Sequence, residues 1–284
     1  MAAFISAAPF SAGVWLVPHC CRLVGAGRAA AARVKRTIWL LLILACAACA
    51  PAATPPPAVG VRIGTTPESR PLVEAWLQAV PAAFTVVDYT SHRQLLRAVA
   101  AGGVAAGISC ASEPASPLVQ VPLAQTALAI IAHPALGLTT LTRDQLQAIV
   151  TGAETEWSAL GAGASTAKVA YREEGSAART AFEQLLLDGK APTPAARVLP
   201  GAQAMIEYVA ATPGALGYAW LSELPAGSTP VAIDGRNPGE AGYAAPATVV
   251  AIAFSEPQGA LREWLAALQR VAPAAMPRGL STLP

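Results

Sequence analysis

The chain has 284 residues, of which 54% are hydrophobic and 13% are charged, and its formal net charge is +2. This length suits one large domain or two small ones, and the hydrophobic share is ample for a core. Part of the positive charge lies in an N-terminal stretch that we expect to be removed. No basic cluster follows it, which argues against nucleic acid as a partner.

The N-terminal region is predicted to be an export leader that covers residues 1–45. Basic side chains gather at residues 33–36, and the uncharged apolar run 37–45 that follows is too short for a stable membrane anchor. This layout is typical of a secretory signal. Residues 1–33 fit no export pattern, so we interpret them as an over-extended start, with the true start near Val34.

A cysteine closes this leader. The segment Ile43-Leu-Ala-Cys46 resembles the lipobox of bacterial lipoproteins, whose cysteine is diacylated, and Cys49 is the alternative. The resemblance implies a lipid anchor on the extracytoplasmic face of the cell membrane. Prolines follow, so residues 46–58 are predicted to be a lipidated Cys and an extended stalk. Beyond the stalk Cys110 stands alone, and the fold therefore has no internal disulfide.

From Val59 onward, expected strands alternate with expected helices. A helix is predicted to open at Thr66-Pro67, because Thr is a good N-cap and Pro suits the first helical position. Ser91 with Gln94 predicts a capping box for the next helix, which ends at the glycines 102–103. Short apolar runs predict strands at 59–63, 84–89, 104–109 and 127–133.

The second half has the same alternation. Thr142 with Gln145 predicts a capping box, and Ser176 is expected to cap a helix that ends at Gly189. Strands are predicted at 168–172, 215–220, 230–234 and 248–254, with a helix at 202–211 and a terminal helix capped by Ser255 and Gln258. This alternation indicates the α/β class, with a largely parallel sheet covered by helices.

Three features at strand ends predict a site for an anion. The turn Gly64-Thr65-Thr66 and the turn Gly175-Ser176-Ala177 each join a strand to a helix, where backbone N–H groups and the helix dipole favour negative charge. Arg172 ends its strand and offers a bidentate guanidinium. In open α/β sheets ligands collect at the carboxyl ends of strands, where all three features lie.

A purely structural interpretation of these residues stays open at this point. Thr66 and Ser176 are good N-caps, and most N-caps bind no ligand. Arg172 has Glu173 and Glu174 beside it as surface partners. The combination on two half-chains favours a shared site, in which Arg172→Ala is expected to abolish binding with little loss of stability. Thr142 is interpreted as structural and Ser91 as marginal.

The order of several segments resembles the phosphate-binding subunits of bacterial ABC importers. The segments are 122–134, 141–152, Trp157-Ser158, 172–182 and 212–218. The resemblance covers Val59 to Ala272. It implies a two-lobed type II periplasmic-binding-protein fold with the ligand in the cleft. Lobe 1 would combine residues 59–132 and 235–272, lobe 2 would be 133–234, and 273–284 would form a tail.

The same resemblance implies a ligand and partners. Ser109 matches a ligand-contacting serine of the family, but the Asp that accepts a proton from hydrogen phosphate is replaced by Cys110. Asp88 or Glu113 are possible substitutes as acceptor. Phosphate is the leading ligand, with tungstate, molybdate, sulfate or a small organic anion open. The implied partners are an ABC permease and ATPase, whereas a sensing or surface-interaction module of the same fold is the alternative.

An enzyme of the α/β-hydrolase type is excluded by the order of its residues. The segment 107–111 faintly resembles a nucleophile elbow around Ser109. In such enzymes the catalytic His comes last, whereas the last histidine here is His133, preceded in the mature chain only by His92. No His and Cys spacing indicates a metal site, and no P-loop is present, so we expect a binding protein without a cofactor.

Overall fold

The computed structural model describes residues 60–113, 116–271 and 276–283. The predicted leader, the lipidation cysteines and the stalk therefore lie outside the described residues. Within the described part of the chain, none of the helices combines the length and the hydropathy that a bilayer crossing demands.

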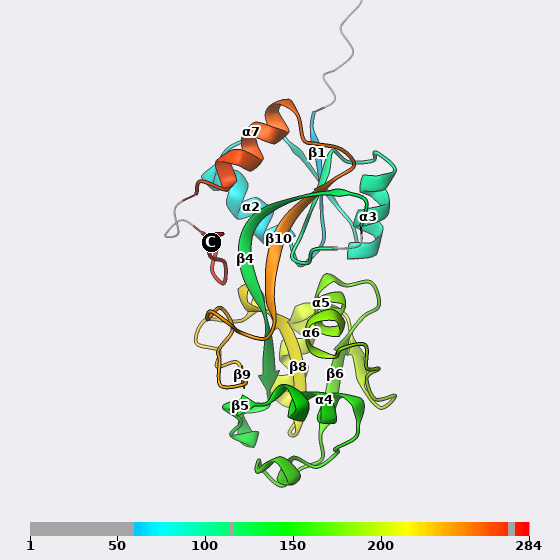
Figure 1. Cartoon of the computed structure of the whole chain (residues 1–284), viewed down its shortest axis with the longest axis vertical. Coiled ribbons are helices and arrows are strands. Elements are labelled where there is room, and N and C mark those ends of the chain that lie inside the picture. The colour runs from blue at the N-terminus through cyan, green and yellow to red at the C-terminus, as the bar shows by residue number, and fades with distance from the viewer. Residues whose placement is uncertain (1–59, 114–115, 272–275, 284) are drawn as a thin grey trace, which may run out of the picture. The chain divides into compact units, whose positions relative to one another are not determined.

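The first group of elements, called lobe 1 here, is a small α/β unit (Figure 1). Strands β1, β2 and β3 pair in parallel, with β1 in the middle. Helices α2, α3 and α7 accompany them. The bounds are β1 Arg62–Thr65, α2 Arg70–Ala79, β2 Thr85–Asp88, α3 His92–Ala100, β3 Ala106–Ser109 and α7 Gly259–Leu268.

The second group, called lobe 2, is built in the same way. Strand β6 pairs in parallel with β7 and β8, and a separate two-stranded sheet joins β5 and β9. The bounds are β5 Thr140–Leu141, α4 Arg143–Thr151, β6 Lys168–Arg172, α5 Ala177–Leu186, β7 Arg197–Leu199, α6 Gly201–Ala211, β8 Ala215–Trp220 and β9 Ala232–Ile233.

Two strands join the lobes. β4, Val119–Ala132, pairs with β10, Pro246–Ala253, along its first part, and its last five residues pair with β8. The result is one eight-stranded sheet in the order β2-β1-β3-β10-β4-β8-β6-β7. The passage from lobe 1 to lobe 2 therefore lies within β4 (Figure 1).

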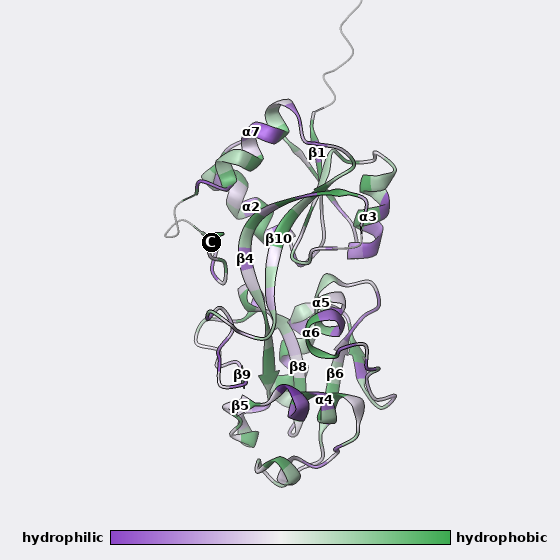
Figure 2. Ribbon diagram, viewed as in Figure 1, coloured by the Kyte–Doolittle hydropathy of each residue, from purple (hydrophilic) through white to green (hydrophobic). Residues whose placement is uncertain are grey.

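The sheet is mixed, which corrects the prediction of a largely parallel sheet. β10 is antiparallel to both β3 and β4, and β4 is antiparallel to β8. The reason is the path of the chain, because it leaves lobe 1 along β4 and returns along β10. Hydrophobic residues are frequent along the second half of β4 (Figure 2). Leu123 and Leu128 are buried in one hydrophobic cluster and Ile131 in another.

Helix α3 packs very closely on the sheet of lobe 1. A Cβ atom on Gly64 of β1 would lie 2.4 Å from Leu95 Cδ1, and one on Gly107 of β3 would lie 2.7 Å from the same atom. Such contacts are shorter than packed atoms tolerate. Glycine at these two positions therefore lets α3 approach, which brings the start of α3 close to the end of β3.

The local signals for helix starts had mixed outcomes. The caps at Thr142 and Ser176 are confirmed. Ser91 also caps its helix, but Gln94 accepts from Thr90 N instead of completing a capping box. The terminal helix α7 has no side-chain cap, so the capping role predicted for Ser255 and Gln258 is wrong.

The predicted start of α2 at Thr66-Pro67 is also wrong. The helix begins at Arg70, and residues 67–69 form a turn. Ser69 Oγ accepts a hydrogen bond from Thr66 N at 3.0 Å, and Thr66 O accepts from the backbone N–H groups of Ser69 and Arg70. These local bonds replace a first helical turn, and they leave Glu68 in the turn instead of on the helix.

Candidate functional site

Arg172 lies at the carboxyl end of β6, and an aromatic group holds its backbone. Arg172 N donates to Tyr218 Oη at 3.0 Å. The ring of Tyr218 is buried and stacks on Phe182 of α5, with the ring centroids 4.1 Å apart. Because β8 and α5 both fix this contact, the position of Arg172 is set by the core of lobe 2.

The guanidinium of Arg172 is bound by two carboxylates. Its Nε donates to Glu173 Oε2 at 2.9 Å, and its Nη2 donates to Glu68 Oε1 at 2.9 Å. The Arg172 side chain is 1% exposed. Burial works to lower the pKa of Arg172, but the hydrogen bond to Glu173 and the charge of Glu68 raise it above its ordinary value. Burial works to raise the pKa of Glu173, but its hydrogen bond with Arg172 outweighs burial and lowers that pKa below its ordinary value.

Glu68 connects the two lobes. It lies in the turn between β1 and α2, its side chain is 5% exposed, and it meets Arg172 from the opposite lobe. Its Oε1 also lies 3.5 Å from Ala178 N in the first turn of α5. A carboxylate of the protein thus takes the place beside a guanidinium and a helix N-terminus that a bound anion would favour. Glu68 is not among the site residues predicted from the sequence.

A second contact between the lobes lies at the surface. Arg93 of α3 forms an ion pair with Glu174 at 2.8 Å, and Arg93 N donates to Gly175 O at 3.3 Å. The two side chains are 52% and 69% exposed, so solvent screens this pair far more than the buried one.

The structure brings three of the predicted site residues to one cavity of about 270 Å³. Thr66, Arg172 and Ser176 line it. Thr65 does not, since its Oγ1 donates to Asp88 Oδ1 at 2.9 Å. Ser109 and Ala177 are buried without lining it. The other residues that line it are Pro67, Glu68, Thr90, Ser91, His92, Glu173, Pro200 and Gly201.

A second cavity, of about 460 Å³, shares Glu68 and Arg172 with the first. It adds the carboxyl of Glu223, the polar Gln203 and Ser222, and apolar groups that include Leu72 and Ile206. Burial, together with the charge of Glu68, raises the pKa of Glu223 to about 8. The Glu68–Arg172 pair therefore borders both a hydroxyl-rich cavity and a second cavity that is acidic and partly apolar.

Cys110 and the two proposed substitute acceptors lie elsewhere. Cys110 is fully buried, and burial raises the pKa of its thiol. Asp88 is paired with Arg70 at 2.6 Å, and Glu113 with His92 at 3.0 Å. None of Cys110, Asp88 and Glu113 lines either cavity. The carboxylates that reach Arg172 are those of Glu68 and Glu173.

Ser109, His92 and Glu113 form a chain of hydrogen bonds within lobe 1. Ser109 Oγ lies 3.0 Å from His92 Nδ1, and His92 Nε2 lies 3.0 Å from Glu113 Oε1. Ser109 Oγ also accepts from Ala111 N at 3.0 Å. Sequence order gave no indication of this pairing, which depends on the close packing of α3. Because Ser109 is 1% exposed and lines neither cavity, the geometry supports a role in fixing the end of β3.

Ser109→Ala is expected to lower the free energy of unfolding by about 1–3 kcal/mol, because it leaves a ring nitrogen of His92 and the N–H of Ala111 without their partner. Urea unfolding followed by tryptophan fluorescence measures the effect. Ser228→Ala is the control, since that exposed hydroxyl has a single bond to Pro225 O and is expected to matter by less than about 0.5 kcal/mol. Equal midpoints for the two variants would contradict the role assigned to Ser109.

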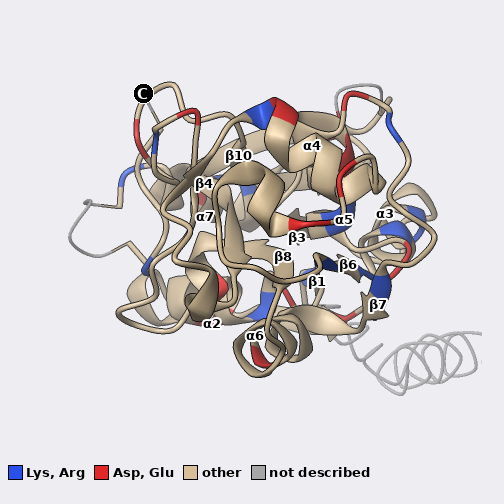
Figure 3. Cartoon of the chain, turned by 90° about the horizontal axis from the view of Figure 1, so that it is seen from below, with Lys and Arg blue, Asp and Glu red and all other residues tan. Residues whose placement is uncertain are grey.

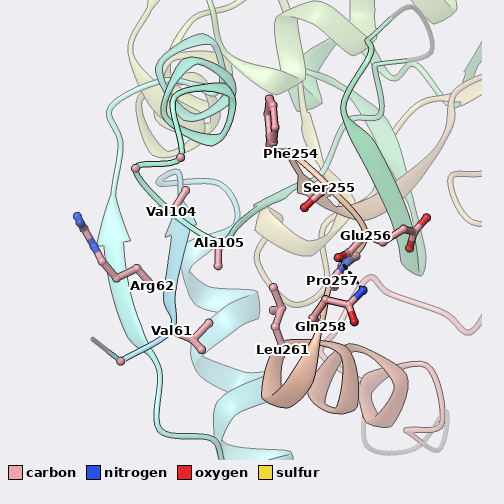
Figure 4. A pocket seen from close by; sticks show the side chains of 13 residues that line it. Val61, Arg62, Val104, Ala105, Phe254, Ser255, Glu256, Pro257, Gln258 and Leu261 are labelled. Carbon is pink, nitrogen blue, oxygen red and sulfur yellow. Dashed lines mark hydrogen bonds between the residues drawn. The ribbon is translucent and has the colours of Figure 1, made fainter. Parts of the chain in front are cut away.

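A pocket of about 560 Å³ lies in lobe 1 away from these residues. It is lined by the start of β1, the segment after α3 and the turn between β10 and α7. Figure 4 shows Phe254 and Ser255 from that turn near Val104 and Ala105. It shares no residue with the two cavities between the lobes.

The distribution of charged side chains over the rest of the described residues does not indicate a second binding site. Lys and Arg are interspersed with Asp and Glu over helices and loops (Figure 3). In the part of the chain that the structure describes, no three His, Cys, Asp or Glu side chains gather as a metal site would need.

Two lobes joined by β4 and β10, with a buried arginine and hydroxyls between them, define the two-lobed solute-binding fold of periplasmic-binding-protein type. The sequence model of the PBP superfamily domain matches residues 50–270. The chain belongs to this superfamily. No curated protein matches the sequence significantly.

Solved structures share the fold at low identity. A protein from Clostridium perfringens, described as a phosphate ABC transporter substrate-binding protein with bound phosphate, aligns with a TM-score of 0.69 and 20% identity over 79% of this chain and 100% of its own. An ABC-type phosphate transport receptor from Vibrio cholerae aligns at 0.61 and 20% over 76% and 95%. A phosphate-binding protein from Stenotrophomonas maltophilia aligns at 0.56 and 17% over 69% and 79%.

Proposed function

We propose that this chain is an extracytoplasmic solute-binding lipoprotein that captures a small oxyanion, with phosphate as the leading candidate, for an ABC importer. The observation that carries the proposal is the cavity between the lobes, where Arg172 lies beside Thr66 and Ser176. A guanidinium beside two hydroxyl groups, one of them at the start of α5, is chemistry that suits an oxyanion. The phosphate-binding descriptions of the structural neighbours agree with this choice of ligand.

Thr65, Ser109 and Ala177 remain predicted contacts, although they do not line the cavity. Ligand capture by this fold proceeds through closure of the lobes. A ligand favours the closed state when it binds that state more tightly than the open one. Both lobes line the cavity, Thr66 from lobe 1 and Ser176 from lobe 2, so an anion held between them would act in this way.

Calorimetric titration of the purified protein with phosphate, sulfate, molybdate and tungstate tests the proposal. We expect at least one oxyanion to bind with a dissociation constant in the micromolar range or below, about −8 kcal/mol or stronger. Heat from none of the four anions would rule out a plain inorganic oxyanion as the ligand. The alternative of a sensing module binds its ligand equally well, and it is distinguished by unchanged uptake of the bound anion in cells that lack the gene.

The lipid anchor has a separate test. Labelling cells with a radioactive or clickable fatty acid is expected to tag the protein, and Cys46→Ser is expected to remove the tag. The matched variant Cys49→Ser should retain the label. The opposite pattern would assign the anchor to Cys49, and no label in the unchanged protein would rule out a lipoprotein.

A further inference from the structure

The Glu68–Arg172 pair has one unsatisfied atom on each partner. Among the described residues, Glu68 Oε2 and Arg172 Nη1 are buried and have no hydrogen-bond partner. Both side chains are more than nine-tenths buried, and both line the two cavities. Buried polar atoms in folded proteins are almost always satisfied. A ligand that completes this site must therefore supply an acceptor to Arg172 and a donor to Glu68.

The charges around the pair favour a ligand with a positive group. Arg172 is the only Lys or Arg among the described residues that line the two cavities, whereas Glu68 and Glu173 place two carboxylates beside it. Taking one partner from a buried ion pair is strongly destabilising, because the other charge is left uncompensated. A fully ionised oxyanion such as sulfate that displaced Glu68 from Arg172 would leave Glu68 in that condition. Hydrogen phosphate offers Glu68 a hydroxyl donor but no positive charge to compensate it.

A zwitterion avoids this cost, because its anionic group binds Arg172 while its cationic group binds Glu68. One buried ion pair is then exchanged for two. The cavities match such a ligand in chemistry, since hydroxyls of Thr66, Ser91 and Ser176 line the smaller one and Glu223 lines the larger. The cavity volumes of about 270 and 460 Å³ are many times the volume of about 30 Å³ that one water molecule takes up. The two cavities together therefore have room for a ligand larger than a single tetrahedral anion.

We propose that the ligand is an amino-substituted oxyanion, whose phosphonate or phosphate group binds Arg172 and whose ammonium group binds Glu68 on the side of Glu223. This inference rests on the proposed oxyanion function and names the class of ligand that the same site takes. Glu68 is then the residue that determines specificity, since it rejects anions that bring no donor.

The test compares 2-aminoethylphosphonate with ethylphosphonate, which has a methyl group in place of the aminomethyl group, and with phosphate. Titration calorimetry of the purified protein is expected to show that the amino compound binds at least about tenfold more tightly than ethylphosphonate and than phosphate. In Glu68→Gln the preference over ethylphosphonate is expected to fall to about twofold or less. The matched control Glu174→Gln removes an exposed carboxylate two residues beyond Arg172 and should keep the full preference.

If Glu68→Gln does not fold, Glu68→Asp replaces it, because the shorter side chain keeps its charge but lies farther from the ammonium group, and we expect a several-fold loss of preference. Equal affinity for the two phosphonates, or a preference that survives in Glu68→Gln, overturns the inference. Tight phosphate binding without an amino preference overturns it while the oxyanion function stands. Failure of all three compounds to bind, together with failure of the four inorganic anions, removes the oxyanion function itself.

Discussion

Arg172→Ala is expected to weaken oxyanion binding by roughly 2–5 kcal/mol, which is about thirty- to several-thousandfold in affinity. Arg172 supplies the only guanidinium or ammonium among the described residues that line the cavities between the lobes, so no neighbour can replace it. Titration calorimetry with the tightest-binding oxyanion measures the loss. Binding within about threefold of the unchanged protein would show that Arg172 is no ligand contact.

The contacts of Arg172 in the structure change the expected effect of Arg172→Ala on stability. From the sequence alone little loss is expected, but Glu68 is 5% exposed and Arg172 is its ion-pair partner. Removing Arg172 leaves a buried carboxylate unpaired, at a cost of about 3–5 kcal/mol while the two lobes stay in contact there. Because Glu68 belongs to the other lobe, opening the lobes returns it to water and relieves part of this cost.

We therefore expect ligand-free Arg172→Ala to be more open and to melt at a lower temperature. Small-angle scattering measures the opening as an increased radius of gyration. Arg93→Ala is the matched control, because it breaks the exposed pair with Glu174 and is expected to cost about 0–1 kcal/mol without opening the lobes. A scattering curve for Arg172→Ala that coincides with that of the unchanged protein would contradict the role of the Glu68–Arg172 pair in closure.

Elements with strong local signals were predictable from the sequence. The bounds of β6 and β8 match the strands predicted at 168–172 and 215–220. The cap at Ser176 follows a strand directly, so its position was also predictable. The prediction was wrong where two polar residues could each precede the same helix. Ser69, and not Thr66, lies directly before α2, because the hydrogen bonds between Thr66 and Ser69 form a turn.

The candidate site was predictable only on its lobe 2 side. Arg172 and Ser176 lie four residues apart. The local sequence pattern places Arg172 at the end of a strand and Ser176 at the start of the next helix. Glu68 is 104 residues away from Arg172 along the chain, and their contact exists only because the lobes meet. The sequence offers only a weak signal for a role of Glu68 in the site, which is the presence of a carboxylate in the short turn after the first strand. The pairing of His92 with Ser109 likewise depends on glycines that let α3 approach the sheet.

Glu223 is expected to make stability fall as the pH rises towards about 8. Burial and the charge of Glu68 raise its pKa from an ordinary 4.5 to about 8 in the folded protein. Between these values the unfolded chain releases the proton while the folded protein keeps it, so the free energy of unfolding decreases with rising pH. The loss is complete above pH 8 and is on the order of a few kcal/mol.

Glu223→Gln is expected to remove this pH dependence, since the amide oxygen still accepts from Trp220 N but cannot ionise. Urea unfolding at pH 6, 7, 8 and 9 should show the variant gaining stability relative to the unchanged protein as the pH increases. Glu174→Gln is the control, because Arg93 lowers the pKa of that exposed carboxyl and its titration falls below this pH range. A constant difference from pH 6 to 9 between the free energy of unfolding of Glu223→Gln and that of the unchanged protein would contradict the raised pKa. That result would show that Glu223 is already ionised in the folded protein at pH 6.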